Sequence, residues 1–271
     1  MDYLRVRNIF SRGSGLFAVL IAGNQYFRKT LNRWPMRAVI LTTDTTHHLY
    51  FARQLAMQFQ VVGIYLETSP FAPTFSVHHT FEDDRERFER DTLLASATES
   101  FDAFAPVFRV STMNHPDAVS NLQRLQTDVA LVFGTGLLRT PVIELPKLAC
   151  LNLHGGNPEA YRGLDSHLWS VYHRDFDNLV TTLHHVARDF DAGDIVLSQK
   201  LVVPRGCELY QLRAINTKTC VDLSVAALTV LEKCGRIPSR PQLTRGRYYS
   251  AMPGALKERC VSEFQRYAAG L

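Results

Sequence analysis

The chain lacks the sequence features of an oxidising compartment and of a membrane span. Its 271 residues include only five cysteines, which are scattered and never form a Cys-x-x-Cys pair. An odd, scattered set of thiols predicts reduced cysteines in a cytoplasmic protein. An apolar stretch at residues 15–22 is far too short to cross a bilayer, and a poor signal-peptide cleavage context follows it. We therefore expect a cytoplasmic protein that does not interact with membranes.

Charge and histidine spacing argue against two further classes of protein. The formal net charge is only +4, and the basic residues are dispersed rather than gathered in a stripe, so nucleic-acid binding is not expected. The ten histidines include three adjacent pairs, but neighbouring side chains on a strand or helix point in different directions. None of these pairs is accompanied by other metal-binding residues at a suitable spacing, and the sequence therefore predicts no bound metal.

Apolar runs alternate with helical patterns along most of the chain. Residues 37–42 and 61–66 read as strands around a helix at 47–59, and this unit implies a parallel sheet. Further strands are expected at 104–110, 128–133, 148–153, 179–186 and 195–203, and further helices at 82–101, 117–126, 137–143, 164–172, 210–231 and 256–269. The pattern predicts an α/β fold, with a Rossmann-like, mostly parallel sheet and helices on both faces.

Composition divides the chain into three parts. Residues 1–35 are expected to form an N-terminal extension, and residues 36–235 the main domain. After Gly235 the composition shifts to prolines, glycines and tyrosines, so residues 236–271 are expected to be a short C-terminal extension rather than a second full domain.

A polar pair interrupts the apolar strand at 148–153. Asn152 and His154 are two residues apart, so on a strand both side chains point to one face while Leu151 and Leu153 point into the core. The carboxyl end of such a strand is where open α/β sheets bind ligands. Taken alone, the pair favours two hydrogen-bonded edge residues that have no catalytic role.

The surrounding motifs resemble those of the folate-dependent formyltransferases. The resemblance rests on Asn152-Leu153-His154-Gly155, Pro158 to Arg162-Gly163, Trp169, Thr182-Leu183-His184 and Asp191-Ala192-Gly193-Asp194-Ile195, in the order and spacing of that family. It is strong over about residues 128–205 and weaker over 36–127. Asp165-Ser166-His167 stands where the family often has proline, and Gly155-Gly156-Asn157 replaces the Ser-Leu-Leu of the tRNA-directed branch. These departures concern the acceptor more than the chemistry.

The resemblance implies a catalytic role for three residues and a folate donor. Asn152 and His154 would hold the formyl oxygen, and Asp191, rather than its rival Asp194, would keep His154 cationic and steer proton transfer. The donor would be 10-formyltetrahydrofolate. Its pocket is expected at Gly134, Thr135, Gly136, Leu137, Leu138, Ala192 and Gly193. Thr182 and His184 are expected to support these residues, with a buried core histidine as the alternative for His184.

The acceptor is expected to be a small-molecule amine. Asp44, His47, Tyr161 and Arg162 are candidate substrate contacts, although Asp44 and His47 could instead cap a helix and Arg162 could pin a loop. A strongly basic C-terminal region and a glycine-rich phosphate loop after residues 37–42 are both missing, which disfavours the tRNA and purine branches. A nucleotide-linked amino sugar is the expected acceptor. The alternatives are hydroxyornithine or another small amine, and a non-catalytic Rossmann-like binding domain. Association as a homodimer is left open.

Overall fold

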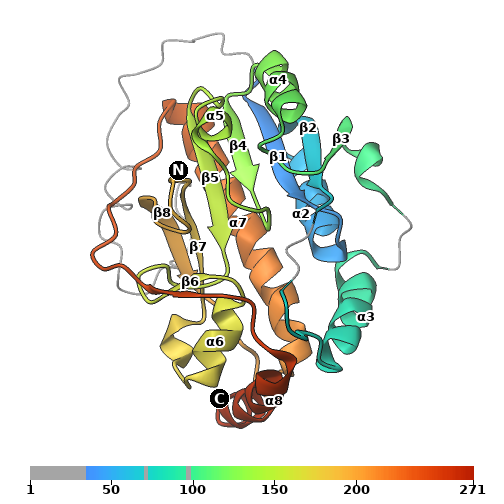
Figure 1. Cartoon of the computed structure of the whole chain (residues 1–271), viewed down its shortest axis with the longest axis vertical. Coiled ribbons are helices and arrows are strands. Elements are labelled where there is room, and N and C mark those ends of the chain that lie inside the picture. The colour runs from blue at the N-terminus through green and yellow to red at the C-terminus, as the bar shows by residue number, and fades with distance from the viewer. Residues whose placement is uncertain (1–34, 70–72, 96–98) are drawn as a thin grey trace, which may run out of the picture. The chain divides into compact units, whose positions relative to one another are not determined.

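The computed structural model describes residues 35–69, 73–95 and 99–271 (Figure 1). The expected N-terminal extension at 1–35 lies outside these residues except for Pro35. Seven strands form one sheet in the order β3-β2-β1-β4-β5-β7-β8. Their bounds are β1 Arg37–Thr43, β2 Gln60–Glu67, β3 Val107–Val110, β4 Val129–Val132, β5 Ala149–His154, β7 Val180–His185 and β8 Ile195–Lys200. The five neighbouring strands β3, β2, β1, β4 and β5 pair in parallel. The pairs β5–β7 and β7–β8 are antiparallel, so the sheet is mostly parallel, as predicted.

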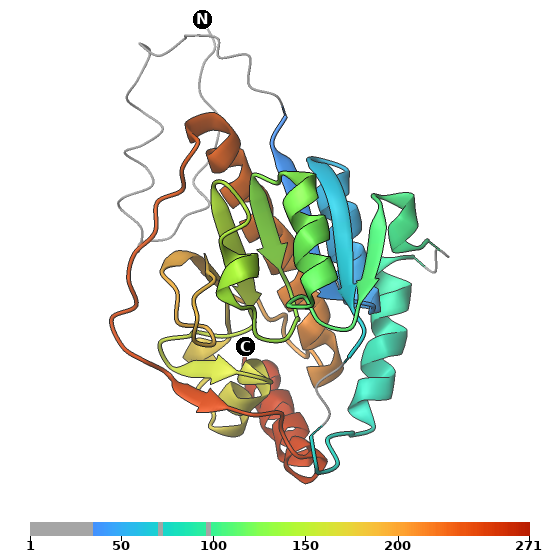
Figure 2. The same ribbon diagram turned by 45° about the horizontal axis from the view of Figure 1, so that its top comes forward.

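Helices cover both faces of the sheet, as Figures 1 and 2 show. The helices are α2 Thr46–Ala56, α3 Phe81–Leu93, α4 Pro116–Leu125, α5 Thr140–Ile143, α6 Ser166–Tyr172, α7 Leu212–Cys234 and α8 Gly254–Ala269, with single turns at η1 Phe101–Ala103, η2 Phe176–Asn178 and η3 Leu209–Gln211. Ile40 of β1 packs towards α2 and α7, whereas Leu41 packs towards α4 and α5. Because both faces are buried, the strand sequence is apolar throughout instead of alternating.

Helix α3 is shorter than the sequence predicted. It ends at Leu93 instead of continuing to residue 101. Ala95 has φ +50, in the left-handed region that stops an α-helix. The prediction extended the helix to residue 101 from the charged residues with spaced apolar positions that precede Ala95, and that pattern carries no sign of this turn.

Helix α7 is the central core helix of the described chain. It follows η3, where Glu208 and Gln211 form a reciprocal capping box, and it ends at Gly235 with φ +70. Leu228 and Leu231 are fully buried in the core between the sheet and α2. Residues 209–234 are long and apolar enough to span a membrane by length and composition, but most of that segment is buried inside the protein. Its apolar character therefore has a sufficient explanation in core packing.

The segment after Gly235 packs onto the preceding residues. Arg240 pairs with Ile195 at the edge of the sheet, and β9 (Arg247–Tyr249) forms a two-stranded parallel sheet with β6 (Tyr161–Gly163). Helix α8 then packs on α6 through buried Phe264 and its neighbours. Neither β6 nor β9 was predicted, because three-residue strands containing glycine or arginine have no recognisable periodicity.

Truncating Leu228 tests the core role of α7. We expect Leu228→Ala to lower the free energy of unfolding by about 2–5 kcal/mol, since it leaves a cavity among packed side chains. Leu243→Ala is the control, because Leu243 is 84% exposed and its truncation should change stability by less than about 0.5 kcal/mol. Urea unfolding of both variants measures this, and equal effects would contradict the assignment.

Candidate active site

Strand β5 ends with the predicted polar pair on one wall of a cavity. Leu151 and Leu153 belong to the buried core cluster, and Asn152 and His154 line the cavity. The neighbouring strand β7 runs antiparallel and places His184 opposite Asn152. The loop after β7 then returns to the end of β5. Its residue Asp191 has φ +49, a left-handed conformation that aspartate tolerates better than most residues.

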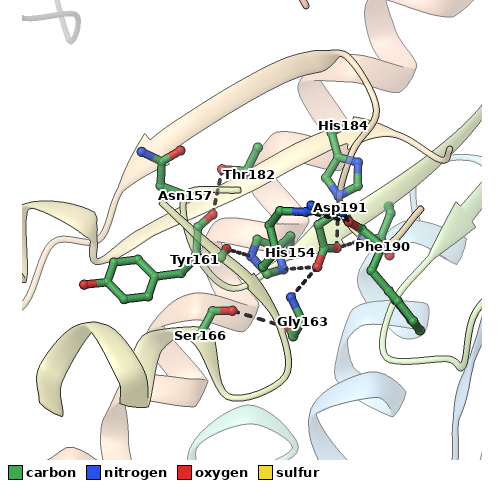
Figure 3. A network of polar contacts seen from close by, with 12 residues as sticks. His154, Asn157, Tyr161, Gly163, Ser166, Thr182, His184, Phe190 and Asp191 are labelled. Atoms are coloured by element: carbon green, nitrogen blue, oxygen red, sulfur yellow. Dashed lines mark hydrogen bonds and ion pairs between the residues drawn. The ribbon is translucent and has the colours of Figure 1, made fainter. Parts of the chain in front are cut away.

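The carboxylate of Asp191 is the centre of the polar network (Figure 3). Its Oδ2 accepts a hydrogen bond of 2.7 Å from the backbone N–H of Gly163 and lies 3.5 Å from His154 Nδ1. Its Oδ1 lies 3.3 Å from Asn152 Nδ2 and 3.4 Å from His184 Nε2. The tertiary structure therefore brings the three predicted catalytic residues together, although 39 residues separate Asn152 from Asp191.

The acceptors around the two histidines indicate where each neutral ring carries its proton. His184 Nδ1 lies 2.8 Å from the carbonyl oxygen of His185, which can only accept, so Nδ1 is the donor and Nε2 accepts from the Asn152 amide at 3.1 Å. In the same way His154 Nε2 donates to the carbonyl oxygen of Tyr161 at 2.8 Å. The Nδ1 lone pair of a neutral His154 therefore faces Asp191.

Burial is the largest influence on the pKa of both His154 and Asp191. It lowers the pKa of His154 below its ordinary value, and the raising effect of Asp191 does not reverse that direction. Burial acts to raise the pKa of Asp191, but His154, His184 and the Gly163 N–H together hold it well below its usual range. At neutral pH the site thus pairs an ionised carboxylate with a neutral imidazole. Desolvation therefore opposes the cationic state expected for His154, and the sequence shows the carboxylate but not this burial.

The loop that carries Asp191 is held by residues from two distant segments. The Arg162 guanidinium donates to the carbonyl oxygen of Phe190, and Gln242 Nε2 donates to the carbonyl oxygens of Asp191 and Gly193 at 2.7 and 2.9 Å. A Cβ at Gly193 would lie 1.8 Å from the carbonyl oxygen of His185, so this close approach requires glycine. Sequence reasoning missed Gln242, since an isolated polar residue in the C-terminal segment shows no sign of what it touches.

The cavity beside this network has a volume of about 1250 Å³. Its walls include the predicted folate segment from Gly134 to Leu138, but neither Ala192 nor Gly193. Two residues missed by the sequence analysis hold that segment. Glu67 Oε2 accepts from Gly136 N at 2.6 Å, and Asn114 Nδ2 donates to the carbonyl oxygen of Leu137 at 2.8 Å.

The predicted substrate contacts divide into two groups. Asp44 and His47 line the cavity, whereas Tyr161 and Arg162 do not. Both of the latter side chains are buried: the Tyr161 hydroxyl donates to Asp175, and Arg162 pins the loop at Phe190. The loop-pinning alternative for Arg162 therefore agrees with the geometry, although its partner is a backbone carbonyl rather than a carboxylate.

A comparison with known protein families identifies the class. A family model described as formyl transferase matches residues 36–215 of this chain. The chain therefore belongs to the formyl transferase family and is a formyltransferase. The matched residues contain all three members of the Asn152, His154 and Asp191 cluster.

Three solved structures share this fold. A 4-N formyltransferase from Francisella tularensis superposes with a TM-score of 0.53 at 15% identity, covering 80% of this chain and 77% of the other. A sugar N-formyltransferase from a Shewanella species gives a TM-score of 0.54 at 12% identity, covering 79% and 76%. HypX from Aquifex aeolicus, in complex with tetrahydrofolic acid, gives a TM-score of 0.55 at 15% identity, covering 87% of this chain and 34% of that one. At these identities the likeness concerns the fold.

Buried histidines around the cavity make the stability of the fold sensitive to acid. Burial lowers the pKa of His48 from 6.5 to about 3 and that of His167 from 6.5 to about 4. An unfolded chain takes up protons at these groups below pH 6.5, whereas the folded chain does not. Their contribution to stability is therefore complete above pH 6.5 and is lost as the pH falls towards 4.

We expect the free energy of unfolding to fall between pH 6.5 and 4. Each buried imidazole contributes a slope of up to about 1.4 kcal/mol per pH unit. Urea unfolding at a series of pH values measures the slope, and His167→Gln should flatten it. His78→Gln serves as the control because that side chain is 62% exposed. A profile that is level from pH 7 to 4 in the parent would contradict this expectation.

Proposed function

We propose that the protein transfers a formyl group from 10-formyltetrahydrofolate to a primary amine of a small molecule. The observation that carries the proposal is the position of the Asn152, His154 and Asp191 cluster on the wall of a cavity that also includes Gly134 to Leu138. The cavity, at about 1250 Å³, exceeds the ~300–1,000 Å³ usual for a single small ligand, so it has room for donor and acceptor together. We assign the pterin ring to the glycine-containing segment at 134–138, whose backbone Glu67 and Asn114 hold by hydrogen bonds.

Formyl transfer requires a stabilised oxyanion and a path for one proton. 10-Formyltetrahydrofolate, when bound, supplies the formyl group on N10; the amine nitrogen forms a bond to the formyl carbon as the bond to N10 breaks. The amine loses a proton and N10 gains one. The residues at the end of β5 are suited to both tasks because they combine an amide donor, a neutral imidazole and an ionised carboxylate.

We assign the transfer of the proton from the amine to N10 to the pair of His154 and Asp191. His154 accepts it at Nδ1, and the Asp191 carboxylate stabilises the imidazolium that results before the proton passes to the leaving nitrogen. Asn152 supplies the oxyanion donor. Its amide hydrogens point at His184 and Asp191, so one of them exchanges its internal acceptor for the formyl oxygen during the reaction.

A nucleotide-linked amino sugar is the acceptor we propose. The name of one protein that shares the fold, a sugar N-formyltransferase, supports this choice at the level of the fold. Hydroxyornithine or another small amine is the alternative acceptor.

We further assign the catalytic domain to residues 36–235. Residues 236–271 form an extension that contributes Gln242. We infer a cytoplasmic location from the five free cysteines.

Replacing single members of the cluster tests the chemistry. Asn152→Ala should lower kcat about 10²–10³-fold through loss of one oxyanion donor, and Asp191→Asn should lower it about 10²–10⁴-fold. Asp194→Asn is the matched control, because Asp194 is exposed and makes no contact with His154. Tetrahydrofolate binding, measured by thermal shift, should persist in all three variants. Near-normal kcat in Asp191→Asn would refute its role, and absence of folate binding in the parent protein would favour a non-catalytic binding domain.

A substrate screen tests the acceptor. The protein is incubated with 10-formyltetrahydrofolate and UDP-, GDP- or dTDP-linked amino sugars, and mass spectrometry detects the gain of one formyl group. We expect at least one amino sugar to be formylated by the parent and not by His154→Ala. Formylation of hydroxyornithine alone would overturn the sugar assignment while leaving the formyl transfer intact.

A further inference from the structure

Two arginines line the cavity among the described residues, and the mechanism uses neither of them. Arg85 comes from α3 and Arg213 from α7, and α3 lies beside η3 and the start of α7 (Figure 1). Both reach the same cavity as Asn152 and His154. The two arginines differ in their acidic partners. That difference makes Arg213 a structural residue and Arg85 a candidate ligand contact.

Arg213 already has a complete partner. Its Nε and one terminal nitrogen each lie 2.6 Å from an oxygen of Glu89, a two-point ion pair. Glu89 is fully buried, so removing Arg213 would leave an uncompensated charge inside the protein. Arg213 therefore stabilises the fold, and its positive charge is neutralised by Glu89.

Arg85 has no such complete partner. One terminal nitrogen lies 3.2 Å from Glu82 Oε1, and Lys257 Nζ lies 3.1 Å from the same oxygen. Two cations therefore share this one carboxylate oxygen. The Nε of Arg85 is buried and has no hydrogen-bond partner among the described residues. A buried donor without an acceptor is unfavourable, and a charged donor more so.

The charges that face Arg85 limit what it can bind. Burial lowers the pKa of Arg85 and Arg213 lowers it further, while Glu82, Glu89 and Asp165 act in the opposite direction. Asp165 already accepts a hydrogen bond of 2.8 Å from Met252 N and also lines the cavity. Acidic groups therefore stand close by, and the region suits one anionic group rather than a cluster of them.

We propose that the Arg85 guanidinium forms a subsite for one oxyanion of the acceptor, a phosphate or a carboxylate. The proposal rests on the proposed formyl transfer, which places the amine of the same acceptor beside Asn152 and His154. An oxyanion at Arg85 gives the guanidinium an acceptor that it does not share with Lys257. It also anchors the acceptor at two points, so that the amine is oriented towards the formyl carbon.

Binding of small anions to matched variants tests the subsite. Inorganic phosphate, pyrophosphate and acetate are titrated by calorimetry into the parent, Arg85→Gln and Arg87→Gln. Arg87 is on the same helix, but its side chain is 68% exposed and pairs with Asp84 outside the cavity. We expect Arg85→Gln to weaken binding of the preferred anion about tenfold or more, and Arg87→Gln to leave it unchanged. Arg213 is unsuitable for this test because of Glu89.

The choice of anion identifies the source of the oxyanion. Tighter binding of phosphate or pyrophosphate supports the subsite and a phosphorylated acceptor, and tighter binding of acetate supports the subsite and a carboxylated amine. Equal affinity in Arg85→Gln and Arg87→Gln, or no binding of any anion to the parent, overturns the proposal. In Arg85→Gln, Lys257 still pairs with Glu82. A second variant, Arg85→Lys, retains the positive charge but lacks the Nε–H. It should bind more weakly than the parent.

Tetrahydrofolate binding to the same samples separates this proposal from the proposed function. Folate binding with no anion binding overturns the subsite alone. Anion binding that depends on Arg85, in a protein that does not bind folate, overturns formyl transfer and leaves the oxyanion site in place. Urea unfolding of Arg85→Gln establishes that weaker anion binding reflects the lost N–H and not a loss of folded protein.

Discussion

The arrangement of the site depends on a single carboxylate that is buried and ionised. Asp191 is held in the ionised form inside the protein by donors to both of its oxygens, the Gly163 N–H and the Asn152 amide. The contacts of this carboxylate also determine the positions of Asn152 and His154. A side chain at this position that could not be ionised would lose the orientation of both neighbours together. The same contacts therefore determine both the geometry of the cluster and the charge of Asp191.

The burial that makes the carboxylate effective also determines the state of the imidazole. Desolvation lowers the pKa of His154, so the ring is a proton acceptor before the reaction and a cation only after it has received a proton. The carboxylate opposes that effect and keeps the protonated state within reach. This balance suits a site that must take a proton from one nitrogen and return it to another. The pKa of His154 depends on burial as well as on Asp191. The presence of a histidine and an aspartate in the sequence does not reveal this burial.

The remainder of the cavity is shaped by contacts between distant parts of the chain. Glu67 and Asn114 hold the segment from Gly134 to Leu138, and Gln242 holds the loop of Asp191. Each of these side chains bonds to backbone groups, so the walls of the cavity are defined by hydrogen bonds rather than by apolar packing alone. The C-terminal segment thus takes part in the architecture of the site.

The sequence by itself determined the class of fold, most elements of the sheet and the face on which Asn152 and His154 lie, because hydrophobic periodicity and strand alternation are local properties. The ordered motifs also led to the family. Only the tertiary structure decided that desolvation lowers the pKa of His154, that Arg162 and Tyr161 do not line the cavity, and that Gln242 holds the loop of Asp191. Desolvation, loop conformation and contacts across 50 or more residues arise from packing, and no pattern within a short stretch of sequence encodes them.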